Sequence, residues 1–212
     1  MVCGSPVVAS ANLLRRLAGE CDHVVAVDRG LDALLGAGLG CDVYVGDADT
    51  VSEAGRALVD AAEDFEVERH DPYKDYTDLA LALDAIRRRW PNAELVATCA
   101  TGGRPDMALS VLGLLANYKD APVWIAEDKV VARILRAGES WTIEGAEGKT
   151  FSIIAIAPNT EVSEHGLEWE LDHASLGLLA DTGISNVVRS TATIQVHTGT
   201  AIAYLYQETF RV

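Results

Sequence analysis

Apolar and polar positions along residues 1–137 predict strands and helices in alternation. Short runs rich in β-branched residues predict strands at Val24–Val27, Val43–Val45, Glu66–Arg69, Glu94–Thr98 and Val123–Ala126. Apolar residues at helical spacing predict helices at Leu31–Ala37, Ser52–Ala62, Thr77–Trp90, Pro105–Tyr118 and Asp128–Arg136. Such alternation is typical of a parallel sheet covered on both faces, so we expect a Rossmann-like α/β domain over residues 1–137.

The pattern changes after Gly138, where turn residues separate short apolar runs and no helical spacing is evident. These runs predict strands at Ser140–Gly145, Thr150–Pro158, Leu167–Leu171, Asn186–Ser190, Thr193–His197 and Ala201–Tyr206. A small antiparallel β-sandwich domain is therefore expected over residues 138–212.

Composition narrows the classes of partner. The 212 residues include 17 basic and 32 acidic ones, a formal net charge of -15, which repels nucleic-acid phosphates. The acidity is explained either by solubility or a salty habitat, or by carboxylates that hold divalent cations. No basic segment precedes an apolar one, and no apolar run reaches about twenty residues, so no membrane partner and a cytoplasmic location are expected.

The first candidate site follows the predicted strand that ends at Gly46. Asp47 and Asp49 are two residues apart, so in an extended chain their side chains point to the same side. Parallel sheets bind ligands at this end of their strands, and two carboxylates there suit Mg²⁺ carried by nucleotide phosphates. The alternative is a solvated turn that caps the following helix.

The second candidate site lies at the start of the helix predicted at Thr77–Trp90. Thr77 is suited to cap this helix, and Asp78 complements the helix dipole. Capping explains neither Asp75, one turn before Asp78, nor Lys74, a positive charge beside both.

The third candidate site is Thr101–Asp106, which joins a predicted strand to a predicted helix. Gly102 and Gly103 let backbone amides approach an anion, and Arg104 can hold a phosphate with two hydrogen bonds. Pro105 suits the first position of the helix.

Taken together, the three sites resemble those of the thiamine pyrophosphokinase family in type and order. The matching segments are Gly46-Asp47-Ala48-Asp49-Thr50, Lys74-Asp75-Tyr76-Thr77-Asp78 and Gly102-Gly103-Arg104-Pro105-Asp106. Gly166-Leu167-Glu168-Trp169-Glu170-Leu171 and Ser185-Asn186 resemble further motifs of that family. The resemblance covers nearly the whole chain.

The resemblance implies a homodimer that transfers diphosphate from MgATP to the hydroxyl of thiamine. It implies catalysis by Asp47, Asp49, Asp75, Asp78 and Arg104, with Mg²⁺ held by those four aspartates. It implies an ATP site made by Asp28, Thr50, Lys74, Thr77, Gly102, Gly103, Arg104 and Asp106. Thiamine would bind at the subunit interface, against Trp169, Ser185 and Asn186.

Three residues depart from the family pattern. Arg29 stands where a small residue is usual, Met107 replaces a histidine, and Val111 replaces a common asparagine. These positions could tune the fit of the acceptor, so another hydroxymethyl heterocycle, such as a pterin, stays open.

Two further alternatives come from other classes of protein. Asp47-Ala48-Asp49-Thr50-Val51 also fits the nucleophile motif of haloacid-dehalogenase phosphatases, although that motif normally follows the first strand of a chain. A nucleotide-binding relative without catalysis is the third alternative.

Overall fold

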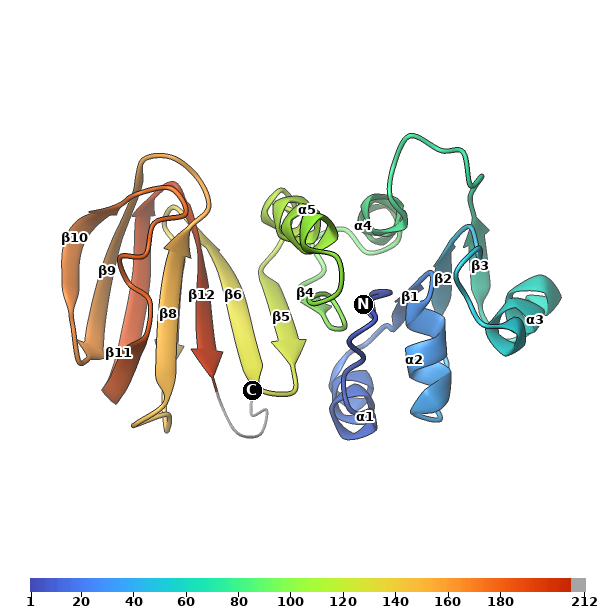
Figure 1. Ribbon diagram of the computed structural model, residues 1–212, viewed down its shortest axis with the longest axis horizontal. Coiled ribbons are helices and arrows are strands. Elements are labelled where there is room, and N and C mark those ends of the chain that lie inside the picture. Colours follow the sequence, from blue (N-terminus) through green and yellow to red (C-terminus); the bar gives the residue numbers. More distant parts are fainter. Residues whose placement is uncertain (207–212) are drawn as a thin grey trace. The chain divides into compact units, whose positions relative to one another are not determined.

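The computed structural model describes residues 1–206, which divide into two compact units (Figure 1). Unit 1 comprises Met1–Ala121 and Ala126–Asp128, and unit 2 comprises Pro122–Ile125 and the chain from Lys129 onward. Each unit is described by itself.

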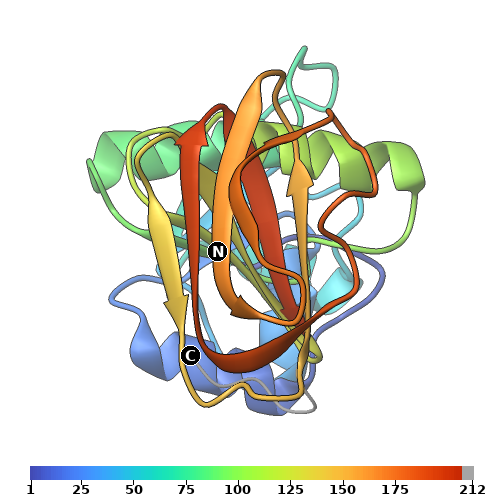
Figure 2. The same cartoon turned by 90° about the vertical axis from the view of Figure 1, so that its left-hand side faces the viewer.

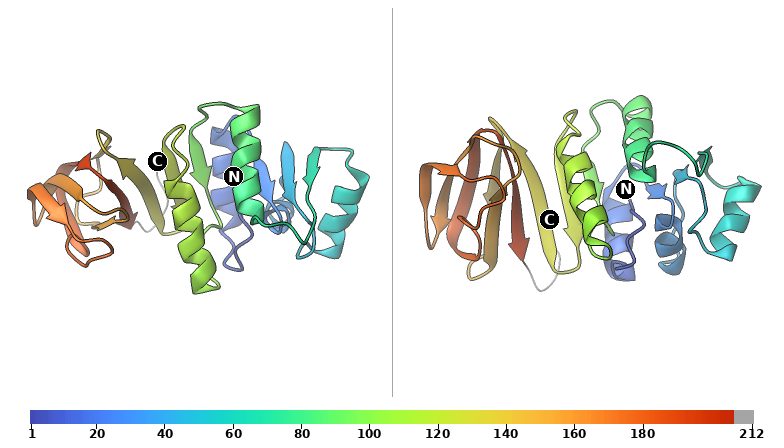
Figure 3. Two further views of the ribbon diagram at one scale, coloured as in Figure 1. Left: turned by 90° about the horizontal axis from the view of Figure 1, so that it is seen from above. Right: turned by 45° about the horizontal axis from the view of Figure 1, so that its top comes forward.

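Unit 1 contains a parallel sheet with helices on both faces. The sheet is formed by β1 (Val25–Val27), β2 (Val43–Gly46) and β3 (Glu66–Arg69), in that order. Every residue of β1 and β2 is buried, as expected for strands covered on both sides. Figures 1 and 3 show α4 on one face of this sheet and α1 and α2 on the other.

Three of the five described helices of unit 1 begin at a residue whose side chain caps them. The five helices are α1 (Ala11–Glu20), α2 (Gly30–Gly36), α3 (Glu53–Ala61), α4 (Asp78–Arg89) and α5 (Pro105–Ala116). The hydroxyls of Ser10, Ser52 and Thr77 accept hydrogen bonds from the first turns of α1, α3 and α4. These caps explain why the predicted starts of α3 and α4 lie within a residue of the observed ones.

The first three residues form β-bridges that the sequence pattern did not predict. Val2 bridges Ala26 of β1 and Thr98, which follows β4 (Leu95–Ala97), in parallel with both. Its amide donates to Val25 O at 2.8 Å and its carbonyl accepts from Val27 N at 2.9 Å. Residues 1–3 are too few to carry a recognisable alternation, so only the structure reveals this pairing.

Unit 2 is built from antiparallel strands (Figure 2). They are β6 (Val130–Arg136), β7 (Ser140–Ile143), β8 (Thr150–Ala155), β9 (Thr160–Leu167), β10 (Leu171–Leu176), β11 (Asn186–Thr198) and β12 (Thr200–Tyr206). One group of neighbours is β6-β12-β8 and the other is β10-β9-β11, with β7 beside β11. The long strand β11 links the groups, because its first residues pair with β8 and its later ones with β9 and β7.

The expected fold class is confirmed, but several predicted elements are wrong. Residues 130–136 form β6 and not a helix, because they pair along their whole length with β12. A turn at Asp128 and Lys129 separates β6 from β5 (Val123–Glu127). Apolar side chains on both faces of a buried strand remove the alternation that would distinguish it from a helix.

Other differences concern α1 and the strands of unit 2. Helix α1 and most of β9 were not predicted, and Leu171 starts β10 instead of ending a strand. The two strands predicted within 186–197 are one continuous strand. The boundary expected at residues 137 and 138 falls inside unit 2, because the pairing of β6 with β12 joins β6 to the β-rich unit.

No described helix combines the length and the apolarity that a membrane crossing needs.

Candidate active site

The edge of the unit 1 sheet gathers the first carboxylates. Val27 and Val45 are partners in register, so Asp28 after β1 and Asp47 after β2 leave the sheet side by side. Gly46 is needed here, because an added Cβ would lie 3.1 Å from Cα and Cβ of Asp28. Parallel pairing and one glycine thus bring together two aspartates that are far apart in sequence.

Asp49 completes an acidic cluster, which we define as Asp28, Asp47 and Asp49. Ala48 has a φ of 64°, and the turn that it makes lets Asp49 N donate to Asp47 Oδ1 at 3.1 Å. One carboxylate oxygen from each of the three residues lies within 4.8 Å of the others. Hard oxygen atoms converging from three residues suit a divalent cation such as Mg²⁺.

Lys74 lies against the acidic cluster. Its Nζ is 2.5 Å from Asp47 Oδ2 and 3.0 Å from Asp78 Oδ1, and its side chain is 14% exposed. Asp78 is the first residue of α4, because Thr77 caps the helix directly before it. Lys74 therefore joins the first and second predicted sites.

The pKa values of the site follow from burial, from hydrogen bonds that include those of Lys74, and from neighbouring negative charges. Burial works against the charged form of Asp47, but hydrogen bonds from Lys74 and Asp49 N hold its pKa below the ordinary value. Burial, followed by the negative charge of neighbours that include Asp47, raises the pKa of Asp49. Burial also raises the pKa of Asp78 despite Lys74. A bound cation would offset this repulsion.

Two hydroxyl groups, of Thr50 and Tyr44, bind the carboxylate of Asp28. The Thr50 hydroxyl donates to Asp28 Oδ2, and the Tyr44 hydroxyl donates to Asp28 Oδ1 at 3.3 Å. Asp28 has a φ of 45°, a strained backbone for a residue other than glycine. These contacts hold the Asp28 carboxylate toward Asp47.

The third predicted site lies at the start of α5. Gly102 and Gly103 have φ values of 92° and 71°, and an added Cβ on Gly103 would lie 2.6 Å from Pro6 Cγ. Arg104 forms a two-bond ion pair with Asp106, Nη2 to Oδ2 at 2.6 Å and Nε to Oδ1 at 3.2 Å, and 76% of its side chain is exposed. Asp106 thus orients the Arg104 guanidinium at the surface.

A cavity of about 510 Å³ connects the three sites, and we call it the main cavity. Its lining includes nine of the predicted residues, Asp28, Asp47, Asp49, Thr50, Lys74, Thr77, Asp78, Gly102 and Arg104. Asp75, Gly103 and Asp106 do not line it. Asp75 is exposed in the loop before the α4 cap, where its spacing from Asp78 is not helical.

The lining also contains residues that the sequence pattern did not assign to a site. They come from the N-terminal segment, from the start of α2, from the loop before α4 and from α5, and include Cys3, Gly4, Ser5, Pro6, Arg29, Tyr76, Ser110 and Leu114. Met107 and Val111, two of the departures from the family pattern, line it as well. The turn residues Gly4-Ser5-Pro6 after an apolar start were the available signal for the first group.

In unit 2, the side-chain amide of Asn186 forms two hydrogen bonds with the backbone of Trp169. Trp169 N donates to Asn186 Oδ1 at 3.1 Å, and Asn186 Nδ2 donates to Trp169 O at 2.7 Å. Asn186 is buried, whereas the Trp169 side chain is 62% exposed and is not a core residue. Ser185 is exposed beside them, and its amide donates to Ser152 Oγ at 3.0 Å. The exposed Trp169 ring presents a flat aromatic face.

These features define a class of protein. It has a parallel α/β domain with a cluster of carboxylates at one sheet edge that suits a divalent cation, followed by an antiparallel β-rich domain. Residues 14–126 match the family model described as "Thiamin pyrophosphokinase, catalytic domain". Residues 140–202 match the one described as "Thiamin pyrophosphokinase, vitamin B1 binding domain". The chain therefore belongs to the thiamin pyrophosphokinase family.

Individual relatives agree with the family match. "Thiamine pyrophosphokinase 1" of Arabidopsis thaliana is 27% identical over 165 residues, 70% of this chain and 58% of that protein. "Thiamine pyrophosphokinase 3" of Oryza sativa subsp. japonica is 28% identical over 170 residues, 72% of this chain and 60% of that protein. The chain thus spans less than two thirds of these curated relatives.

Solved structures match nearly the whole chain. The thiamin pyrophosphokinase of Geobacillus thermodenitrificans has a TM-score of 0.79 at 27% identity, covering 97% of this chain and 95% of that one. The enzyme of Candida albicans has a TM-score of 0.82 at 13% identity, covering 97% and 88%, and shows similarity of fold alone.

Proposed function

We propose that this chain transfers a diphosphoryl group from MgATP to the primary hydroxyl of thiamine, giving thiamine diphosphate and AMP. The observation that carries the proposal is the acidic cluster, paired with Lys74 beside the main cavity in a member of this family. ATP is the co-substrate of the proposed reaction.

The carboxylate oxygens of the acidic cluster are suitable ligands for Mg²⁺. The oxygens of Asp28, Asp47 and Asp49 converge within 4.8 Å, and Asp78 also lines the cavity. We propose that Asp47 and Asp49 hold the ion together with Asp28 or Asp78. Asp75 lies outside the lining of the main cavity, and its role as a ligand stays a prediction. Bound there, Mg²⁺ would neutralise charge on phosphate oxygens.

The protein groups supply charge and orientation. Lys74 and Arg104 balance the negative charge of the phosphates, and the Asp78 carboxylate accepts a hydrogen bond from the thiamine hydroxyl and orients it. The hydroxyl oxygen forms a bond to the β-phosphorus, and the bond from that phosphorus to the oxygen shared with the α-phosphate breaks. AMP leaves with this oxygen, and the hydroxyl proton passes to solvent. Such chemistry depends mainly on positioning and electrostatics.

The acceptor side of the proposal rests on unit 2. The exposed Trp169 ring offers a face to the cationic thiazolium or the aminopyrimidine, and Ser185 and Asn186 add polar atoms beside it. A homodimer and a cytoplasmic location are part of the proposal. Light scattering coupled to size-exclusion chromatography tests the dimer, and a monomer at micromolar concentration would contradict it.

Mass spectrometry after incubation with MgATP and thiamine tests the reaction. We expect AMP and thiamine diphosphate in equal amounts. Asp47→Asn removes a charge from the acidic cluster and should lower AMP formation at least about a hundredfold. Asp84→Asn removes the same charge from an exposed side chain of α4 outside the main cavity and should not. An active Asp47→Asn would overturn the site.

The same experiment separates the other interpretations. AMP formed only with a hydroxymethyl pterin would identify a different acceptor. Inorganic phosphate alone would indicate a phosphatase, and nucleotide retention without turnover would indicate a binding protein. The names of the matched proteins favour thiamine over these alternatives.

A further inference from the structure

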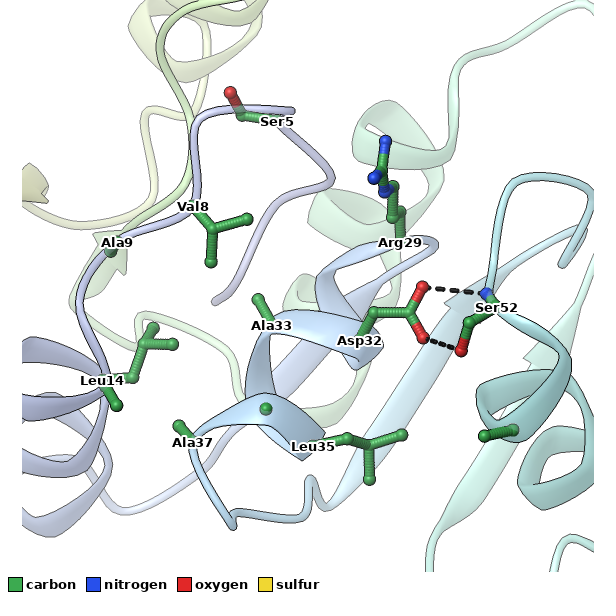
Figure 4. A pocket seen from close by; sticks show the side chains of 13 residues that line it. Ser5, Val8, Ala9, Leu14, Arg29, Asp32, Ala33, Leu35, Ala37 and Ser52 are labelled. Atoms are coloured by element: carbon green, nitrogen blue, oxygen red, sulfur yellow. Dashed lines mark hydrogen bonds between the residues drawn. The ribbon is translucent and has the colours of Figure 1, made fainter.

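Arg29 lies where two cavities of unit 1 meet. It lines the main cavity, and it also lines a second cavity of about 510 Å³ between the first loop, α2 and the start of α3 (Figure 4). The second cavity is lined mainly by small and aliphatic side chains, such as Ala9, Leu14 and Ala33. Among residues 1–206, Arg29 is the one cation in that lining.

The other cations of the main cavity already have carboxylate partners. Lys74 is paired with Asp47 and Asp78, and Arg104 is paired with Asp106. Within residues 1–206 the structure gives Arg29 no ion pair and no side-chain hydrogen bond. The nearby Asp32 carboxylate instead accepts from Ser52, from its amide at 2.8 Å and from its hydroxyl, and Figure 4 shows Arg29 directed away from it.

Arg29 is an exposed residue whose stem starts close to Gly4. A Cβ added to Gly4 would lie 3.3 Å from Arg29 Cβ, and one added to Gly30 would lie 2.1 Å from Val2 O. The chain at Val2 and Gly4 therefore passes close to the backbone at this position. Arg29 itself has an ordinary helical backbone, with φ −58° and ψ −12°, so that other side chains fit here without strain.

A free guanidinium selects an anion. Of the two substrates proposed above, thiamine carries a positive charge and would be repelled, whereas the nucleotide carries its charge on its phosphates. The planar fork of arginine donates two parallel hydrogen bonds to a phosphate, a geometry that lysine does not offer.

We propose that Arg29 binds the polyphosphate chain of the nucleotide and so makes this chain select a nucleoside triphosphate over the monophosphate. The inference rests on the proposed function. Because the residue follows Asp28 directly, a phosphate held by Arg29 stays beside the acidic cluster. The selection would also favour departure of AMP after transfer.

Binding measured by isothermal titration calorimetry on the full chain tests this inference without turnover. The probes are the Mg²⁺ complex of α,β-methylene-ATP, in which carbon replaces the oxygen of the breaking bond, and AMP. Arg29→Ala should weaken binding of the triphosphate analogue about tenfold or more and that of AMP less than about twofold. Arg29→Lys should recover only part of the loss. Arg88→Ala, an exposed residue outside both cavities, should change neither.

Equal weakening of both ligands, or unchanged binding of the analogue, would overturn the inference. If Arg29→Ala does not fold by circular dichroism, Arg29→Gln keeps most of the stem and gives the same comparison. A wild-type chain that binds the analogue but makes no thiamine diphosphate would overturn the proposed function alone. An active wild-type chain with unchanged binding in Arg29→Ala would overturn this inference alone, and a wild-type chain that does not bind the analogue would overturn both.

Discussion

Two buried carboxylates, Asp47 in unit 1 and Glu164 in unit 2, lie in opposite environments. Asp47 follows the end of a strand, faces the main cavity and has Lys74 as a partner. Glu164 lies inside β9, opposite Leu171 of β10 and Ile194 of β11, and is fully buried. Neither of its oxygens has a hydrogen-bond partner of normal geometry among the described residues.

The two environments move the pKa in opposite directions. The pKa of Asp47 is lowered despite burial, because Lys74 and a backbone amide favour the charged form. Burial raises the pKa of Glu164 to about 8, and only the nearby Asn186 amide opposes it. A carboxylate at a strand end can thus stay charged for binding, whereas one enclosed within a strand is neutral near pH 7.

The largest effect is expected for Glu164→Gln. From pH 4.5 to about 8 the folded chain keeps a proton that the unfolded chain releases, so that the stabilisation present below pH 4.5 is lost as pH rises through this window. Glutamine does not titrate and should remove this dependence, a difference of up to about 5 kcal/mol at pH 9. Urea denaturation from pH 5 to pH 9 measures it.

The exposed Glu144→Gln serves as the control for Glu164→Gln. Parallel pH profiles for the wild type and Glu164→Gln would mean that Glu164 is charged in the folded state and that its environment is not the apolar one described here.

A smaller effect is expected for Lys74→Met. It leaves Asp47 and Asp78 without their cation, and should lower the free energy of unfolding by about 2–3 kcal/mol in the absence of Mg²⁺. Adding Mg²⁺ should restore part of the loss, because a cation bound by the acidic cluster replaces the missing charge. Denaturation with and without Mg²⁺ measures both values.

Arg88→Met is the matched control for Lys74→Met, since it breaks an exposed ion pair and should cost under about 1 kcal/mol with no response to Mg²⁺. A Lys74→Met chain as stable as this control, or one indifferent to Mg²⁺, would show that Asp47 does not depend on a cation.

The smallest effect is expected for Trp169→Ala, which tests the surface of unit 2 instead of its interior. The exposed ring can be removed with little loss of stability, yet KM for thiamine should rise about tenfold, while KM for MgATP should stay within about twofold. Steady-state kinetics with each substrate varied in turn measures the change. Trp124→Ala alters a ring that packs on Trp141 instead, and a similar rise in KM there would attribute the effect to general loosening of unit 2.

Much of unit 1 was predictable because local signals and sheet physics agree. Caps at Ser52 and Thr77 mark helix starts, and carboxyl ends of parallel strands share one edge, so that separate motifs had to meet there. Less of unit 2 was predictable, because β6 has apolar side chains on both faces and β11 continues through a stretch that looked like two strands.

The sequence by itself determined the acidic edge: Asp47, Asp49 and Lys74 are assigned from spacing at strand and helix ends, which depends on local geometry. Only the tertiary structure decided that the Asp28 carboxylate lies within the acidic cluster, that Asp75 stays outside the main cavity, and that Arg29 has no carboxylate partner within residues 1–206. It also decided the state of Glu164, which on sequence alone is one more acidic residue on a chain of charge -15. Spacing fixes which side chains share a face, whereas burial and pairing depend on segments that are distant in sequence.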